Sequence, residues 1–289
     1  MTPTGVTPPH SLPRRVAPAI VLAALLLQAA LTSLINLWLF PAEVLNPIAQ
    51  ATKGLLMPTL VANWILLGLV IGGVVMGWGR LRWRDLDLDH GLRHALLISV
   101  AVWVIAQLLM LATGTTTVDP RWSQSPVAQA GNFLAQALGN ALYEETLFRA
   151  FLIWQVAWWL SRRSSAERIS SGQLSVAVIV SQVVFALQHI PNRIMKGAYS
   201  SVADVLQDQT QLFLAGVVFA ILYVRTRNLW LCVFLHALVN RPSSIFTGDG
   251  SELAQIVTGA APFTLALAMG VAWLWRTRVA RRSDRGQPA

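Results

Sequence analysis

Three charged side chains lie close together in an otherwise apolar stretch of the sequence. The segment ALYEETLFRAF, residues 141–151, contains Glu144, Glu145 and Arg149. Glu145 and Arg149 are spaced i,i+4 with the acid first, which favours an ion pair on a helix, and a structural pair is the simplest interpretation of these two. Glu144 lies about 100° further around the same helix. Because it has no evident partner, Glu144 is the strongest candidate for chemistry.

Two later apolar segments add two imidazoles and an amide. In VVFALQHIP, Phe185 and His189 share a helix face, and in FLHALVNRP, His236 and Asn240 do the same. With a rise of about 1.5 Å per residue, the helices bring these polar side chains to depths comparable with that of Glu144. One acid, two imidazoles and an amide that meet inside an apolar bundle would form a site for polar chemistry.

Each of these residues has a simpler explanation when it is taken alone. A histidine near the end of a membrane helix, such as His189, is often an interfacial residue. Asn240 precedes Arg-Pro, which is typical of a helix C-cap, and Phe185 is typical of core packing. The four polar residues together are more specific than any one of them.

The helices that must position these residues are expected to lie in a membrane. The chain has 289 residues, of which 55% are hydrophobic and 12% charged, with a mean hydropathy of +0.55, whereas a soluble protein has about 25% charged residues. A single cysteine, Cys232, excludes a disulfide framework. We expect an all-α fold, a polytopic membrane helix bundle of about eight transmembrane helices, at residues 16–40, 56–78, 94–113, 127–160, 172–190, 208–224, 228–240 and 257–275.

The basic residues predict an orientation for this bundle. If the amino terminus is cytoplasmic, 16 of the 22 Lys and Arg residues lie in cytoplasmic segments and five in outer segments, and Arg149 alone lies within a span. The positive-inside rule then places both termini in the cytoplasm, as for a cell-membrane protein. A nucleic-acid-binding protein would gather these residues on one face. Since they are dispersed among alternate loops, we expect a lipid bilayer as the partner and no nucleic acid.

The sequence indicates a single transmembrane domain, residues 16–275, between two polar tails. Residues 1–15 are rich in proline and are expected to be disordered, and residues 276–289 form a basic C-terminal tail. The region from about 125 to 245 differs from the rest because its spans contain ionisable and amide groups at helical spacing.

Three motifs in this region resemble those of a known family. EETLFR, FALQH and HALVN are similar, in this order, to the motifs EExxxR, FxxxH and HxxxN or HxxxD of the CPBP family, which comprises CaaX proteases, bacteriocin-processing enzymes and Abi-like proteins. The stretch RWRDLDL at 82–88 also resembles a short upstream segment of these proteins. The resemblance covers about residues 80–245 and implies a protease core at about 125–245.

The resemblance implies a role for each matched residue. Glu144 would be the general base and would act with His189 to activate a water molecule. His236 and Asn240 would polarise the scissile carbonyl and stabilise the oxyanion. Glu145 with Arg149 would hold the first helix in register, with Phe185 as a further supporting residue.

The sequence leaves the need for a metal open. Two histidines and a glutamate, here His189, His236 and Glu144, match a catalytic zinc set with an open fourth position. The metalloprotease spacing H-E-x-x-H is not in the sequence, and the three residues come from three separate helices. We therefore favour chemistry that requires no cofactor, with a divalent metal such as zinc as the alternative.

The leading hypothesis is an intramembrane endopeptidase that hydrolyses a membrane-embedded or lipid-anchored protein or peptide. One alternative is a non-catalytic membrane immunity or scaffolding protein, and another is a proton-coupled transporter, which buried Glu and His residues also suggest. No internal repeat is visible, which weakens the transporter hypothesis. The predicted orientation opens the site away from the cytoplasm and disfavours prenylated CaaX tails, and a helix count wrong by one would invert this conclusion.

Overall fold

The structure is a computed structural model that describes residues 13–114, 117–161 and 169–247, together with residues 252, 255–257, 259–261, 264, 265 and 268. Residues 1–12 of the expected N-terminal tail and the expected basic tail, 276–289, lie outside the described residues. So does most of the expected last helix, 257–275.

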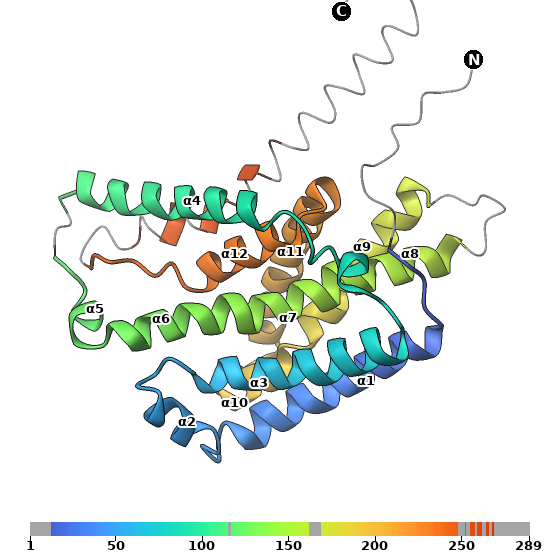
Figure 1. Ribbon diagram of the computed structural model, residues 1–289, viewed down its shortest axis with the longest axis horizontal. Coiled ribbons are helices and arrows are strands. Elements are labelled where there is room, and N and C mark those ends of the chain that lie inside the picture. The colour runs from blue at the N-terminus through green and yellow to red at the C-terminus, as the bar shows by residue number, and fades with distance from the viewer. Residues whose placement is uncertain are drawn as a thin grey trace, which may run out of the picture.

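The described chain forms a helical bundle (Figure 1). Its α-helices are α1 (Pro18–Leu34), α2 (Asn46–Ala51), α3 (Pro58–Leu66), α4 (Leu92–Ala112), α5 (Pro120–Gln124), α6 (Pro126–Leu134), α7 (Leu142–Glu144), α8 (Ile153–Ser161), α9 (Ser171–Leu187), α10 (Ile190–Met195), α11 (Val202–Thr226) and α12 (Leu229–Asn240). π-helical segments continue or join several of them at Ile35–Leu39, Leu67–Trp78, Ala135–Ala141 and Glu145–Leu152, and Trp83–Leu86 is a 3₁₀ turn. The only β pairing in the described part is an isolated bridge between Val118 and Phe246. The predicted all-α class is confirmed.

Five helices of the described chain are long and apolar enough to cross a bilayer, namely Pro18–Leu39, Pro58–Trp78, Leu92–Ala112, Ser171–Met195 and Val202–Thr226. A polytopic membrane bundle is therefore confirmed, whereas the number of eight spans stays a prediction. Helix α12 is apolar but shorter, and the helix that contains Glu144 is excluded from the five by its composition.

That helix runs without a break over residues 126–161 and forms the centre of the bundle. In Figure 1 its segments α6 and α7 lie between α4 and α12 on one side and α1 and α3 on the other. Every residue of its π-helical part, Glu145–Leu152, is buried. Small residues let α3 approach it, because a Cβ on Gly139 would lie only 3.3 Å from the Leu60 Cα. The charged residues of the sequence motif are thus held in the most buried part of the protein.

Two helix boundaries near the site differ from the prediction for local reasons. Helix α11 begins earlier than expected, at Val202, because Ser201 and Asp204 form a capping box there. Helix α9 ends at Leu187, and Pro191 lies in the first turn of α10, where proline is well tolerated. The helical pattern is therefore interrupted at Gln188 and His189 and resumes at Ile190.

One end of the bundle is fastened by a hydrogen-bonded group that we call the Asp87 network: Asp87, Trp154, Tyr223 and Arg227. The Asp87 carboxylate accepts from Arg227 Nε at 2.8 Å and Nη2 at 3.0 Å, and from the Tyr223 hydroxyl at 2.5 Å. Trp154 Nε1 donates to the same hydroxyl at 3.2 Å. The network ties the loop before α4 to α8 and to the α11–α12 turn.

The start of the described chain is bonded to the same end. Gln155 accepts from the Val16 N–H at 2.9 Å and donates to the Arg14 carbonyl at 2.9 Å, and Trp158 donates to the Pro13 carbonyl. The last residues of the expected disordered tail are therefore held against α8.

Candidate functional site

The Glu144 carboxylate lies between two imidazoles that come from two other helices. Its Oε1 is 3.6 Å from His189 Nε2, at the junction of α9 and α10, and its Oε2 is 3.7 Å from His236 Nε2 on α12. Glu144 and His236 are buried, and the His189 side chain is 19% exposed. The structure thus brings together three of the four polar residues that the sequence analysis selects, and gives the site one partly open side at His189.

The neighbouring carboxylate, Glu145, contacts the same histidine from the other side. Glu145 Oε1 is 2.7 Å from His236 Nδ1, and its Oε2 is 3.3 Å from Arg149 Nε. The ion pair with Arg149 is the one that the spacing predicts, and both of its side chains are fully buried. The bond to His236 was not predicted, because sequence spacing within one helix says nothing of a partner on α12.

These contacts fix which ring nitrogens carry hydrogen. The His189 Nδ1 lies 2.9 Å from the Phe185 carbonyl oxygen, and a carbonyl only accepts, so Nδ1 is protonated. His236 Nδ1 likewise donates to the Glu145 carboxylate. Each histidine therefore directs Nε2 towards Glu144.

The charges of the cluster can balance without further partners. Arg149 and Glu145 are of opposite sign and in contact. Glu144 faces two imidazoles, either of which would offset its negative charge if it carried a second ring hydrogen. A neutral cluster is the form that a low-dielectric interior tolerates best.

Phe185 packs at the centre of the cluster. The Arg149 guanidinium lies over its ring at 4.1 Å from the centroid, within the range of a cation–π interaction. The ring centroids of Phe185 and His189 are 4.9 Å apart in an edge-to-face arrangement. Phe185 therefore separates the Arg149 charge from His189 and orients the imidazole by contact.

Asn240 lies one helical turn beyond His236, at the end of α12. Its side chain is exposed, and its amide donates to Gln136 Oε1 at 3.3 Å. Gln136 is on the same helix as Glu144, two turns earlier. The structure therefore places Asn240 at the rim of the cluster, where its amide is bonded to the central helix.

Buried polar residues around the cluster were not predicted from the sequence. Gln182 is fully buried on α9, and neither of its amide atoms has a hydrogen-bond partner among the described residues. A Cβ on Gly216 would lie 2.6 Å from Gln182 Oε1, so a larger residue at 216 would have to displace the Gln182 amide. The sequence signal was a glutamine in an apolar span, one helical turn before Ala186 and two before His189.

The donor types of Glu144, His189 and His236 suit zinc. As placed, however, the described residues contain no group of three or more His, Cys, Asp and Glu arranged to hold a metal ion. We therefore derive no step through a metal.

Comparison with protein families places this site in a known group. Residues 126–241 match the model of the family described as type II CAAX prenyl endopeptidase Rce1-like. The matched segment, which is less than half of the chain, is similar to this family. The matched segment runs from the first residue of α6 to the residue after α12, so it contains every residue of the cluster. The CPBP resemblance is confirmed, and the Rce1-like match supports an intramembrane protease function.

Comparisons with curated proteins and with solved structures gave no match. The apolar helices and the Rce1-like family together show that the chain is an integral membrane protein. The 82–88 stretch and helices α1–α5 lie outside the matched segment.

Proposed function

We propose that this Rce1-like protein is an intramembrane endopeptidase in which Glu144 and His189 activate a water molecule to hydrolyse a peptide bond. The observation that carries the proposal is the position of the Glu144 carboxylate between two imidazole Nε2 atoms, at 3.6 and 3.7 Å. These separations exceed a direct hydrogen bond, and such a gap between polar groups suits a bridging water.

The protonation pattern supports a water in this position. The Nδ1 of His189 donates to the Phe185 carbonyl, so in the neutral ring Nε2 is an acceptor, as is the Glu144 carboxylate. A water between them would donate one hydrogen to each. Its oxygen lone pairs would then point outwards, towards a substrate carbonyl carbon.

In the proposed reaction, the water oxygen bonds to the carbonyl carbon and Glu144 takes the proton. The tetrahedral intermediate then breaks its C–N bond, and Glu144 returns the proton to the leaving amine. General base catalysis of this kind contributes about 10²–10⁴ in rate.

The developing oxyanion would be stabilised by His236 and Asn240. Protonated His236 donates Nδ1–H to Glu145 and has Nε2–H for the oxyanion. The Asn240 amide has two hydrogens, so it can keep its bond to Gln136 and donate the second one. Loss of one oxyanion donor typically costs about 10²–10³ in kcat.

The proposed substrate is a membrane-embedded or lipid-anchored peptide, because the cluster is buried among apolar helices. The family description names CAAX prenyl endopeptidases, which makes a prenylated C-terminal tail one candidate. The positive-inside prediction, with both termini cytoplasmic in the cell membrane, favours inserted or exported peptides instead. The Asp87 network joins the loop before α4 to the α11–α12 turn, and the Val16–Gln155 bond joins the start of the described chain to α8. These contacts support a common end of the bundle for the basic segments that the prediction places in the cytoplasm.

The test is cleavage of a panel of membrane-anchored and prenylated peptides by the purified protein in bilayers, with and without a chelator. We expect cleavage that resists chelation and that falls at least about 10²-fold in Glu144→Gln. Glu43→Gln, at an exposed carboxylate, is the matched control and should retain wild-type activity. Full activity of a correctly folded Glu144→Gln protein would remove the proposed role, and loss of activity with the chelator would favour the metal alternative.

A further inference from the structure

The chain on both sides of His189 is bonded to the first helix by two pairs of side-chain amides. Gln28 Nε2 donates to Gln188 Oε1 at 2.7 Å, and Asn192 Nδ2 donates to Asn36 Oδ1 at 2.7 Å. Gln188 directly precedes His189, and Asn192 follows it in the first turn of α10. The interruption between α9 and α10, which contains His189, is therefore fastened to the first helix at both of its ends.

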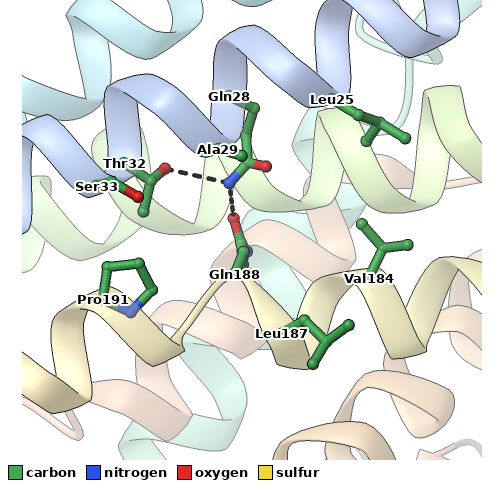
Figure 2. A pocket seen from close by; sticks show the side chains of 9 residues that line it. All are labelled: Leu25, Gln28, Ala29, Thr32, Ser33, Val184, Leu187, Gln188 and Pro191. Atoms are coloured by element: carbon green, nitrogen blue, oxygen red, sulfur yellow. Dashed lines mark hydrogen bonds between the residues drawn. The ribbon is translucent and has the colours of Figure 1, made fainter.

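A threonine joins the two amides of the first helix into one unit. Thr32 accepts from Gln28 through its hydroxyl at 3.1 Å and from Asn36 Nδ2 through its carbonyl at 2.9 Å. Residues four apart lie on the same side of a helix, and Figure 2 shows the Gln28 amide between Thr32 and Gln188. Gln28 and Asn36 are buried. We call Gln28, Thr32 and Asn36, from α1 and its π-helical continuation, the α1 clamp.

Apolar packing alone would not hold the α9–α10 junction in one position. Lipid tails are as apolar as leucine, so contacts between membrane helices depend on close packing and on hydrogen bonds between helices. Next to the junction, α9 exposes Val183 and Leu187, which keep an apolar environment in lipid if the helix shifts. The directional bonds of Gln188 and Asn192 to the α1 clamp oppose such a shift.

The Gln28–Gln188 pair contributes a defined position more than it contributes stability. Gln188 Nε2 is buried and has no hydrogen-bond partner within the described part of the chain. The surroundings of the pair include Leu25, Val184 and Leu187. Replacing both partners of a buried hydrogen bond by apolar groups of the same shape is nearly neutral or even stabilising. An apolar pair could therefore fill the same space, but it would not fix the direction of the contact.

The position of this junction decides where the His189 ring points. The ring bonds back to the Phe185 carbonyl through Nδ1, so its direction follows the backbone at the end of α9. His189 Nε2 then lies 3.6 Å from Glu144 Oε1. A displacement of about 1 Å in a catalytic site can reduce the rate about 10²-fold. A shift of the junction would therefore reach the proposed catalytic pair directly.

We propose that the residues of the α1 clamp are positioning residues, which hold His189 at a fixed distance from Glu144 during hydrolysis. The proposal rests on the proposed protease function. Helix α1 lies outside the segment 126–241 that matches the family. The clamp therefore extends the site beyond the matched segment, to a helix that contacts neither Glu144 nor the substrate in the proposed reaction.

The test separates position from stability with a paired substitution. Gln28→Leu/Gln188→Leu removes one of the two bonds and puts apolar side chains in apolar surroundings, so the unfolding temperature should stay close to that of the wild type. Cleavage of one anchored peptide by the full-length protein in bilayers should show a kcat about tenfold lower, with KM within about twofold of the wild-type value.

The matched control breaks the bonds of a different buried glutamine. Gln155 bonds the Val16 N–H and the Arg14 carbonyl at the start of the described chain. Gln155→Leu should lower the unfolding temperature, because it leaves the Val16 N–H without its acceptor. The rate per folded protein should remain that of the wild type, since these bonds lie away from His189.

Nitrogen NMR of histidine-labelled protein in bilayers provides a readout that does not depend on cleavage. The His189 signals are assigned by their loss in His189→Gln. In the wild type they should show one tautomer, with hydrogen on Nδ1, because of the bond to the Phe185 carbonyl. In Gln28→Leu/Gln188→Leu they should broaden or show both tautomers, and in Gln155→Leu they should stay unchanged.

A wild-type kcat in Gln28→Leu/Gln188→Leu, or a change in KM alone, would overturn the clamp and leave the protease function standing. A slower rate with unchanged His189 signals would also overturn it, because the loss would then arise elsewhere. If the wild type cleaves no peptide, the protease function fails and the NMR comparison alone decides the clamp. Broadened His189 signals would then support the clamp, and unchanged signals would overturn it.

Discussion

Two clusters of buried polar residues occupy different parts of the bundle and are satisfied to different degrees. In the Asp87 network, the carboxylate, the guanidinium and the Tyr223 hydroxyl are joined by bonds of 2.5–3.0 Å. In the Glu144 cluster, the corresponding separations are mostly 3.3–3.7 Å. The bond between Glu145 and His236, at 2.7 Å, is the exception.

The two clusters differ in how many of their buried polar atoms have hydrogen-bond partners. Among the described residues, Glu144 Oε2, Glu145 Oε2 and the three Arg149 side-chain nitrogens have no hydrogen-bond partner. Native proteins rarely leave buried polar atoms in this condition, and a catalytic role is one of the accepted explanations. In the Asp87 network, Arg227 uses its bidentate geometry on one carboxylate and lies over the Trp154 ring at 4.5 Å. The comparison therefore separates a fully bonded structural network from a cluster with unused hydrogen-bonding capacity, to which we assign the proposed catalytic role.

The largest expected effect is a loss of activity when a residue of the Glu144 cluster is changed. His189→Gln keeps a polar side chain but removes the imidazole Nε2 that would accept a hydrogen bond from the attacking water beside Glu144, so kcat should fall by about 10²–10⁴. The unfolding temperature should stay close to that of the wild type, since the His189 side chain is partly exposed and bonds to the backbone through the Phe185 carbonyl. Cleavage rates and thermal unfolding of the same preparation test this. A variant that loses stability but keeps its rate would reverse the assignment of the two regions.

The opposite pattern is expected for the Asp87 network. Asp87→Asn leaves the buried Arg227 charge without its carboxylate, which typically costs about 3–5 kcal/mol. The unfolding temperature should therefore drop sharply, while the folded fraction should cleave at close to the wild-type rate. The measurement is thermal unfolding, with activity normalised to folded protein. Asp85→Asn, at a half-buried residue of the same loop, is the control and should have a smaller effect.

The smallest expected effect is a pH dependence of the unfolding temperature, caused by His90 beside the Asp87 network. Burial lowers the pKa of His90, but the hydrogen bonds of its ring to Asp89 and to the Arg227 carbonyl, with the nearby Asp87 charge, raise it above its ordinary value overall. A raised pKa stabilises the fold below the unfolded-state value and loses that contribution as pH rises through the folded-state value. The unfolding temperature should therefore decline modestly between about pH 6 and 8. His90→Gln should flatten this decline, and an unchanged slope in the variant would contradict the assignment.

The sequence predicted the central helix and its internal ion pair well, because both follow from local spacing. Glu145 and Arg149 are paired as i,i+4 geometry requires, and the run of apolar residues defines the helix over 126–161 to within a residue. The convergence of Glu144 with His189 and His236 followed from comparable depths in a membrane, which restricts how helices can be arranged.

Contacts between helices could not be predicted in the same way. The Glu145–His236 bond, the Gln28–Gln188 pair and the Asp87 network join residues far apart in the sequence, and no periodicity encodes such partners. The bond between Asn240 and Gln136 was not predicted for the same reason. The spacing of Asn240 from His236 gives its position on α12 but not its partner on another helix.

The central claim is that Glu144 and His189 act as one unit on one water molecule. A double-mutant cycle of Glu144→Gln and His189→Gln, measured by single-turnover cleavage of one anchored peptide, tests it most directly. The account predicts strong non-additivity, with the double variant about as slow as the slower single variant. Losses that multiply, each variant reducing the rate by the same factor whether or not the other residue is changed, would contradict it.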